Sequence, residues 1–315
     1  MGIKIHIKNY TAADKTTWNT FVENSYNGTF IHHRDYMDYH ADRFDDYSLM
    51  LYDNGKLIGL IPAHRIDNKL FSHNGLTFGD WINSKNFPPQ LLVEIWKHVL
   101  FYLKQTGIDD FYLKEIPVFL TRYLSHRNRL AFTETGQINK KAWFSVIDTR
   151  KPLDKLLNTD RKQNLAKAPD VVVRESDDWP IFWNILQENL KRRHQTAPVH
   201  SLDEILLLRS NFPENIKLFG GYRNNDMLAG AVVYIYRNVF HFQYISTYPE
   251  GVNRRVIDKL IWELLQNHYH RYDFISLGTS EQQGKIYEPL AYWKYSFGAE
   301  PVEQLFWYFD VKNME

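Results

Sequence analysis

The chain has 315 residues, of which 44% are hydrophobic and 16% aromatic, with 38 basic residues against 37 acidic ones. This length is too great for one ordinary domain and predicts two, and the aromatic content excludes a disordered chain. The near balance of charge excludes a global field that would drive nonspecific binding to nucleic acid or to a membrane. The chain has no cysteine, so disulfides, thiolate metal sites and a cysteine nucleophile are excluded.

The first eight residues alternate apolar and polar side chains. This pattern predicts a strand, and it lacks the apolar core of a signal peptide. No stretch of the sequence approaches the roughly 18 to 20 apolar residues that a membrane-spanning helix needs. We therefore expect a soluble, cytoplasmic protein without a transmembrane segment.

Two hairpins of the same plan occur in the two halves of the chain. In the first half, strands are predicted over 47–52 and 57–61, joined by a tight Asp-Asn-Gly turn. In the second half, strands are predicted over 216–219 and 228–233, again around a polar turn. The returning strands place Leu-Ile-Gly and Leu-Ala-Gly at the same point, which indicates an internal duplication.

A helix and a strand follow each hairpin. Apolar residues at helical spacing predict helices over 92–103 and 256–265. Strands that begin with Asp-Phe follow them at 110–113 and 273–276. A hairpin, a crossover helix and a returning strand predict a mixed α/β (α+β) sheet in each half, with a right-handed connection.

The two domains are expected to join between residues 148 and 170. We take them as 1–155 and 156–315. The alternating segment 303–311 predicts a last strand. This strand can pair in either half, so it is expected to belong to the second domain or to be shared with the first.

A polar segment at 191–200 separates two predicted helices, the second of which begins with a capping box at Ser201. Such a segment can line a cleft. Arg193 can then contact an anionic group on a substrate, and His194 or His200 can act as a base near neutral pH. The alternative is a basic helix terminus that complements the helix dipole.

The segment from Phe274 to Ser280, a polar loop and then Tyr292 to Glu300 resembles the end of FemAB-type acyltransferases. In this family an aromatic-Lys pair precedes Phe-Gly, and here Trp293-Lys294 precedes Phe297-Gly298. The resemblance implies a tandem fold of the acyl-CoA N-acyltransferase (GNAT) superfamily. It extends to further segments, which are 27–30, 76–79 and 161–173.

The resemblance also implies where the substrates bind. In such folds, backbone amides at the separation of two central strands polarise the acyl carbonyl, which assigns that role to the strand 241–247. Gln243, Ser246, Thr247 and Thr279 are therefore predicted to bind substrate. The alternative is an ordinary core strand.

Two side chains near the end of the chain are predicted to be catalytic, together with His194. Lys294 would place a cation near the developing oxyanion or the phosphate of the donor, as the resemblance implies. Tyr287 lies in the preceding loop, where a phenol can protonate a leaving group. A solvated lysine that follows a buried tryptophan is the alternative for Lys294.

The resemblance places the donor-binding turn after the strand 239–247. This turn contains Gly251, Asn253, Arg254 and Arg255, with a single glycine where the superfamily has a glycine-rich turn. The two arginines are expected in the first turn of a helix, where they oppose the helix dipole and either contact phosphate or lie in solvent.

The leading hypothesis is a FemAB-like N-acyltransferase. The donor would be an acyl-CoA or an aminoacyl-tRNA, used as a co-substrate with no tightly bound cofactor. The acceptor would be an amine on a cell-envelope precursor, an amino sugar or a small metabolite. The alternative is a non-catalytic scaffold that retains the GNAT fold.

A third hypothesis is an RNA-binding module that uses a set of four cations, which are Arg161, Lys162, Arg254 and Arg255. No DNA partner is expected, and the sequence does not predict an oligomeric state. The histidines near residues 32–40 and 268–270 lack carboxylates at zinc-site spacing, so no metal site is predicted.

Overall fold

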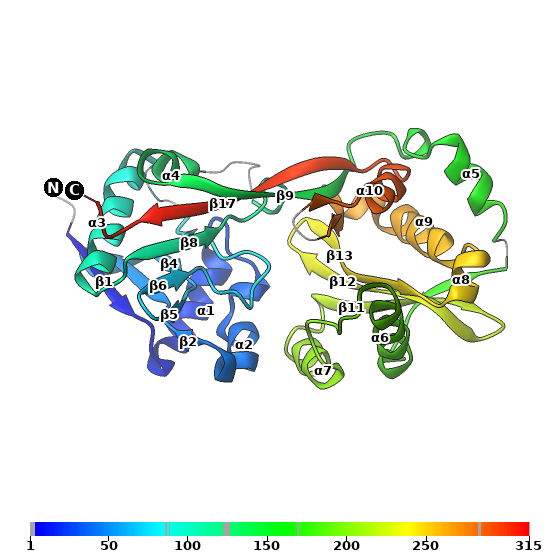
Figure 1. Ribbon diagram of the computed structural model, residues 1–315, viewed down its shortest axis with the longest axis horizontal. Helices are drawn as coiled ribbons and strands as arrows, with labels where there is room; N and C mark the ends of the chain where they lie inside the picture. Colours follow the sequence, from blue (N-terminus) through cyan, green and yellow to red (C-terminus); the bar gives the residue numbers. More distant parts are fainter. Residues whose placement is uncertain are drawn as a thin grey trace. The chain divides into compact units, whose positions relative to one another are not determined.

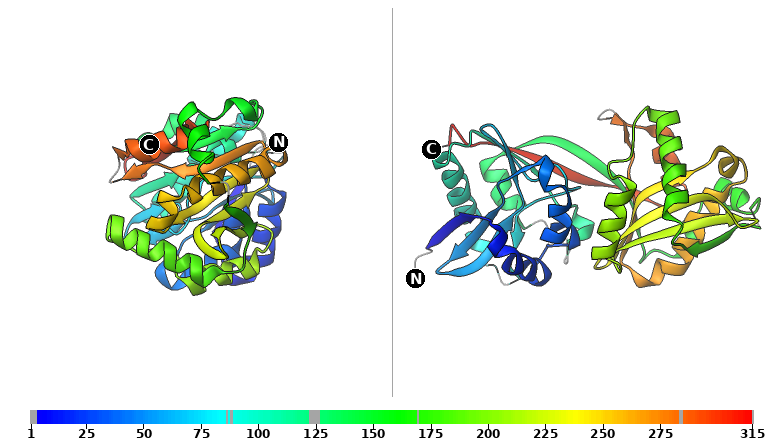
Figure 2. Two further views of the ribbon diagram at one scale, coloured as in Figure 1. Left: turned by 90° about the vertical axis from the view of Figure 1, so that its right-hand side faces the viewer. Right: turned by 90° about the horizontal axis from the view of Figure 1, so that it is seen from below.

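The computed structural model describes residues 4–85, 87, 89–121, 127–168, 170–282 and 285–314. The chain forms two compact units, of which the first comprises 1–142 with 303–315 and the second comprises 143–302 (Figure 1). Both ends of the chain belong to the first unit (Figure 2, right). The domain boundary expected from the sequence, between residues 155 and 156, stays a prediction.

The first unit contains two sheets and several helices. Its strands are β1 (Ile5–Asn9), β2 (Asp45–Asp46), β3 (Leu49–Asp53), β4 (Lys56–Ile61), β5 (His64–Ile66), β6 (Lys69–Phe71), β7 (Ile82–Asn83), β8 (Asp110–Lys114) and the end of β17 (Glu300–Asp310). Its helices are α1 (Lys15–Asn24), α2 (Arg34–Met37), α3 (Leu92–Gln105) and α4 (Arg129–Thr135). One sheet has the order β1-β3-β4-β7, and β17-β8-β6-β5-β2 are neighbours in the other.

The core of the first unit lies under α3. The buried stripe of this helix includes Ile95, Trp96, Val99 and Leu103, as its apolar spacing predicts. Trp96 stacks on Trp81 with 5.5 Å between ring centroids. The crossover from β6 through α3 to β8 joins parallel strands, and β17 runs antiparallel beside β8 (Figure 1).

The second unit is built on one main sheet. Its strands are the end of β9 (Gln137–Asp148), β10 (Val172–Glu175), β11 (Ile216–Arg223), β12 (Asp226–Tyr236), β13 (Val239–Thr247), β14 (Phe274–Thr279), β15 (Glu281–Gln282) and β16 (Lys285–Ile286). Its helices are α5 (Thr159–Leu165), α6 (Trp179–His194), α7 (Leu202–Asn211), α8 (Pro249–Asn253), α9 (Val256–His268) and α10 (Glu288–Tyr295). The strand order is β10-β11-β12-β13-β14-β9, and only the β13–β14 pair among these neighbours is parallel.

Glycines let helices pack closely on both faces of this sheet. A Cβ atom on Gly230 would lie 2.3 Å from the ring of Phe182 in α6, and one on Gly221 would lie 2.9 Å from Val256 in α9. Because each glycine faces a different helix, α6 and α9 cover opposite faces of the β11–β13 sheet (Figure 1).

The predicted fold class is confirmed. Each unit contains a hairpin, a crossover helix and a following strand, with β3–β4 and β11–β12 as the hairpins. In the second unit β14 returns beside β13 as expected. In the first unit β8 pairs with β6 in the other sheet, so the expected return beside the β3–β4 hairpin is wrong there. The predicted capping box at Ser201 is present at the start of α7. Over the described part of the chain, none of the helices combines the length and apolar character needed to cross a bilayer.

Candidate active site

The site is created where β13 and β14 separate. In these parallel strands, Val239–His241 of β13 pairs with Phe274–Ser276 of β14. The pairing ends there, although β13 continues to Thr247. In addition, β13 carries a bulge, because Val232 and Val233 of β12 pair with Tyr244 and Phe242 and leave Gln243 as an extra residue. Backbone groups along the separated edges are therefore positioned to meet a ligand instead of a neighbouring strand.

A cavity of about 780 Å³ opens at this separation. Helices α6, α9 and α10 contribute to its walls, together with β13 and β14. Its lining includes many of the residues that the sequence predicted, which are Arg193, Gln243, Ser246, Thr247, Arg255, Thr279, Tyr287 and Lys294. The fold thus gathers residues that are up to about 100 positions apart in sequence around one volume of the size that small-molecule sites have.

Lys294 is the most unusual group in the cavity wall. Its side chain is only 4% exposed, and its Nζ donates a hydrogen bond to the backbone oxygen of Thr279 at 2.5 Å. Burial lowers the pKa of Lys294 to about 7 because the charged ammonium loses its hydration. Near neutral pH this side chain can therefore either accept or donate a proton.

His241 and Ser276 lie behind the cavity, on the paired part of the two strands. The His241 Nδ1 and Ser276 Oγ are 3.0 Å apart, and both side chains are buried. Burial, and then the charge of Lys294, lower the pKa of His241 to about 4, so this imidazole is neutral at pH 7. The N–H of Gly278 donates a hydrogen bond to Ser276 Oγ at 3.3 Å, and Gly278 adopts a φ of +73°, a conformation that favours glycine. Sequence analysis missed this group because each residue alone is typical of a core strand.

A buried ion pair attaches α10 to the rest of the unit. Arg161 of α5 lies 2.5 Å from Asp258 of α9, and the two side chains are 7% and 3% exposed. Asp258 also accepts a hydrogen bond from the indole N–H of Trp293, and Arg161 donates to Ser296 Oγ. These contacts flank Lys294 on both sides in sequence, so they fix the position of its helix.

The RNA-binding hypothesis required Arg161 to lie on an exposed basic face together with Lys162, Arg254 and Arg255. Arg161 instead points inward to Asp258 and is buried. This hypothesis therefore loses one of its four cations.

Two predicted residues of the segment 191–200 are not seen to reach the cavity. His200 is buried, and its Nδ1 lies 2.6 Å from the hydroxyl of Tyr244, with Tyr244 absent from the cavity lining. The side chain of His194 lies outside the described part of the structure. The catalytic role of His194 and the substrate-binding role of His200 stay predictions.

The predicted donor-binding turn contributes Arg255 to the cavity, whereas Gly251, Asn253 and Arg254 do not line it. The sequence led us to expect the two arginines in the first turn of a helix, and this expectation is wrong. Arg254 follows the short helix α8, and Arg255 precedes α9 with a φ of +57°, so a tight turn separates two helices here. Arg254 forms an ion pair with Glu250 at 2.9 Å.

Gly251 has a packing role that its substitution can test. A Cβ atom at this position would lie 2.3 Å from Thr247 Oγ1 and 2.8 Å from the backbone oxygen of Leu228. We expect Gly251→Ala to lower the free energy of unfolding by about 1 to 3 kcal/mol, measured by denaturant titration. Asn253→Ala in the same short helix is the control and should change it by less than about 0.5 kcal/mol. Equal effects of the two substitutions would contradict the packing role.

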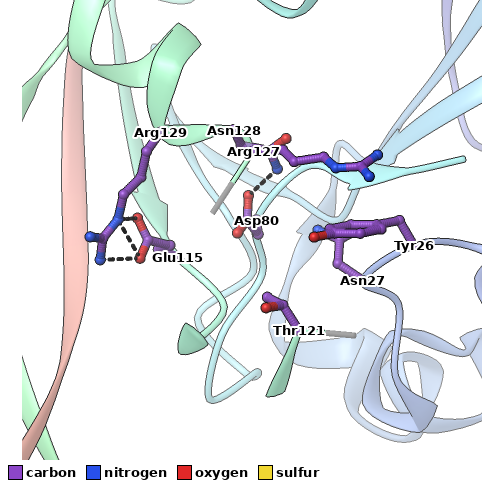
Figure 3. Close-up of a pocket in the computed structure, with 8 residues that line it drawn as sticks. All are labelled: Tyr26, Asn27, Asp80, Glu115, Thr121, Arg127, Asn128 and Arg129. Atoms are coloured by element: carbon purple, nitrogen blue, oxygen red, sulfur yellow. Dashed lines mark hydrogen bonds and ion pairs between the residues drawn. The ribbon is translucent and has the colours of Figure 1, made fainter. Parts of the chain in front are cut away.

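A second, much smaller pocket lies in the first unit (Figure 3). Its volume of about 10 Å³ has room for one water molecule at most. Glu115 is buried and forms a bidentate ion pair with Arg129, while Asp80 accepts hydrogen bonds from Asn128 and from backbone N–H groups. Burial, and then the charge of Glu115, raise the pKa of Asp80 to about 7. The pocket that these residues line is too small to hold a substrate.

The chain matches no family model and no curated protein. Solved structures nevertheless share its fold over almost the whole length. FemX superposes with a TM-score of 0.65 at 9% identity, covering 95% of this chain and 96% of that one. The C-terminal domain of a putative lysylphosphatidylglycerol synthetase from Agrobacterium fabrum gives 0.60 at 12% identity, with 96% and 92% covered. A tandem GNAT protein from the clavulanic acid biosynthesis pathway gives 0.54 at 8% identity, with 99% and 100% covered.

These similarities show that the chain has the fold of FemX and of a tandem GNAT protein. They confirm, at the level of the fold, the resemblance that Trp293-Lys294 and Phe297-Gly298 indicate in the sequence. Chemistry has to be argued from the cavity itself, because similar folds carry different activities.

Proposed function

We propose that this protein is a FemAB-like N-acyltransferase, which moves an acyl or aminoacyl group from an acyl-CoA or aminoacyl-tRNA donor to an amine. The observation that carries the proposal is Lys294, whose buried amine lies in the wall of a large cavity and has a pKa of about 7. Strongly shifted pKa values in a cavity wall are common at functional sites.

The reaction needs the amine of the acceptor to attack the acyl carbonyl of the donor. We propose that the carbonyl lies at the separated edges of β13 and β14, where backbone groups can stabilise the negative charge that develops on its oxygen. Lys294 in its neutral form accepts the proton that the attacking amine loses, directly or through water. As an ammonium ion it then returns this proton to the leaving group.

Two cations in the cavity wall suit an anionic donor. Arg193 reaches the cavity from the end of α6, and Arg255 reaches it from the start of α9. A guanidinium binds phosphate oxygens in a bidentate manner, and both donor classes carry phosphate. Thr247 of β13 and Thr279 of β14 add hydroxyl groups to the same cavity wall.

The acceptor is proposed to be an amine on a cell-envelope precursor, with an amino sugar or a small metabolite as the other candidates. The fold is shared both with a putative lysylphosphatidylglycerol synthetase domain and with a protein of the clavulanic acid biosynthesis pathway, so it is compatible with an envelope acceptor and with a small metabolite. A non-catalytic scaffold is the less favoured reading, because the cavity is open at Gln243 and Thr247 instead of being filled by side chains.

A panel of donors and acceptors tests this proposal. The purified protein is incubated with acetyl-CoA, octanoyl-CoA, alanyl-tRNA and leucyl-tRNA, each with amino sugars, amino acids and peptidoglycan precursor peptides. Mass spectrometry of the acceptor should show a new amide with at least one donor. Absence of transfer from every donor, together with absence of donor binding in thermal-shift measurements, would sink the proposal.

A further inference from the structure

Another cavity, of about 480 Å³, lies in the second unit next to the cavity that contains Lys294. It is formed by the second half of α6 and by the junction of β13 and α8, and we call it the α6 cavity. The cavity that contains Lys294 is called the reaction cavity. The volume of the α6 cavity lies within the range of small-molecule sites, and the proposed reaction gives it no role.

The helix α6 contributes to both cavities through neighbouring sides. Ile185, Glu188 and Arg192 follow one another at helical spacing and line the α6 cavity. The next side of the same helix lines the reaction cavity. Asn189 and Thr247 line both cavities, so they form a shared wall. A ligand in the α6 cavity therefore lies next to the proposed site of acyl transfer.

The guanidinium of Arg192 is anchored by a chain of hydrogen bonds. It donates to Asn189 Oδ1 at 3.1 Å, and the side-chain amide of Asn189 donates to Ser246 Oγ at 3.1 Å. Ser246 is buried in β13 and donates in turn to the backbone oxygen of Ile185. A guanidinium has five N–H groups, and this chain uses one of them. Arg192 can therefore bind an oxyanion in the cavity through the others.

Glu188 brings a negative charge to the same cavity. Asn184 donates hydrogen bonds to Glu188 Oε1 at 3.1 Å and to the hydroxyl of Tyr248 at 2.9 Å, so it links the carboxylate to the opposite wall. Lys191 and Arg192 follow at the helical positions where ion pairs commonly form. Within the described part of the chain, however, Glu188 makes no ion pair with either. Its carboxylate can therefore bind the ammonium group of a ligand.

The α6 cavity thus offers binding groups for two opposite charges. Arg192 and Lys191 suit an oxyanion, and Glu188 suits an ammonium group. Tyr248 and Pro249 add ring surface, against which the carbon skeleton of a small molecule can pack. A molecule that carries both charges on one short skeleton satisfies all of these groups at once.

We propose that the α6 cavity binds the acceptor, and that the acceptor carries an oxyanion, either a carboxylate or a phosphate, on the same short skeleton as its amine. This inference rests on the proposed function and narrows its acceptor. Arg192 and Lys191 hold the oxyanion, and Glu188 attracts the ammonium form of the amine. Once deprotonated, the amine reaches the donor past the shared wall of Asn189 and Thr247. The transfer step is the one already proposed.

Binding measurements without a donor test the inference. The full chain is screened by thermal shift and then by titration calorimetry with the twenty protein amino acids, which carry a carboxylate, and with O-phosphoethanolamine, which carries a phosphate. The zwitterion that binds best is compared with the analogue that lacks its oxyanion and the analogue that lacks its amine. It should bind at least about tenfold more tightly than either, the effect of one lost hydrogen bond between charged groups.

Charge variants show whether the named residues bind the ligand. Arg192→Gln should weaken binding of the zwitterion about tenfold and have little effect on the analogue without an oxyanion. Glu188→Gln should weaken it several-fold and have little effect on the analogue without an amine. Lys162→Gln is the matched control, because Lys162 is an exposed cation of the same unit that lines neither cavity. Equal losses for all three ligands in the two variants would indicate a structural role and overturn the inference.

Transfer assays separate this inference from the proposed function. With an active donor, the new amide should form on the zwitterion that binds, and Arg192→Gln should raise its KM more than it lowers kcat. If amines without an oxyanion are acylated equally well, the inference is wrong and the acyltransferase stands. Binding of a zwitterion that is not acylated, while other amines are, would overturn the acceptor role.

The site can also be judged if no donor is active. The proposed function then fails, but binding that depends on Arg192 and Glu188 supports a site for a zwitterion in the α6 cavity. Absence of binding by every amino acid and by O-phosphoethanolamine rejects this site.

Discussion

Replacement of Lys294 by methionine is expected to lower kcat/KM by about 10²- to 10⁴-fold, the range that loss of a general acid or base produces. Methionine keeps most of the volume and the apolar stem, but it cannot take the proton from the attacking amine. The donor should still bind, because the phosphate-binding candidates Arg193 and Arg255 remain. Steady-state rates with the best donor of the panel, together with thermal shifts by that donor, measure the two effects separately.

The first unit offers a matched control for this variant. Lys114 is partly buried, desolvation lowers its pKa to about 8, and it too donates a hydrogen bond to a backbone oxygen, that of Leu76. It does not line the cavity of the second unit. Lys114→Met should therefore leave the rate constants within about twofold. A comparable loss of activity in the two variants would show that Lys294 acts through the fold and not in the reaction.

The pH dependence gives a second check on Lys294. Because the neutral amine is the proton acceptor, kcat/KM should rise with pH up to about 7 and then level, and this limb should be absent from Lys294→Met.

The lowered pKa of Lys294 also makes the free energy of unfolding depend on pH. The unfolded chain binds the lysine proton up to its ordinary pKa of 10.5, so between pH 7 and 10.5 it holds more protons than the native state. The free energy of unfolding of the wild type should therefore rise relative to Lys294→Met, by about 2 kcal/mol from pH 7 to 9.

Sequence reasoning predicted the parts of this fold that depend on neighbouring residues. The hairpins β3–β4 and β11–β12, the helices α3 and α9 and the strands that follow them all have their signal in spacing within about 15 residues. The pairing of β17 with β8 could not be predicted, since an alternating strand carries no label of its partner. The turn around Arg255 was also misjudged, because a positive φ at a non-glycine residue has no pattern in the sequence.

The candidate site was predicted as a set of residues but not as a geometry. Lys294 was found through a family-like pair of residues, whereas its burial depends on α9 and α10 packing together. His241 and Ser276 were not singled out, because their contact exists only once β13 and β14 pair. Gly251 was assigned to the donor by analogy, and its contacts with Thr247 and Leu228 indicate a role in packing.

The ion pair between Arg161 and Asp258 is expected to give the largest change in stability. Removing one member of a buried pair leaves the other charge without compensation, at a cost of about 3 to 5 kcal/mol. Asp258→Asn should lower the free energy of unfolding by this amount, measured by denaturant titration, because it leaves buried Arg161 without a carboxylate. Arg161→Met should cost less, since Arg255 still lies 3.8 Å from Asp258. The exposed pair Arg209–Asp177 is the control, and Arg209→Met should cost no more than about 1 kcal/mol.

The double variant distinguishes the pair from two independent contacts. If Arg161 and Asp258 matter mainly because each neutralises the other, Arg161→Met with Asp258→Asn should cost clearly less than the sum of the single changes. Additive losses would contradict this role.

The pair also bears on catalysis, because Asp258 accepts a hydrogen bond from Trp293, the residue before Lys294. Asp258→Asn should therefore lower kcat as well as stability, whereas a stabilising change elsewhere that restores the free energy of unfolding should not restore kcat. A loss of kcat that persists after stability is restored would show that the pair holds the amine of Lys294 in position. Recovery of kcat together with stability would show that the pair acts only through the fold.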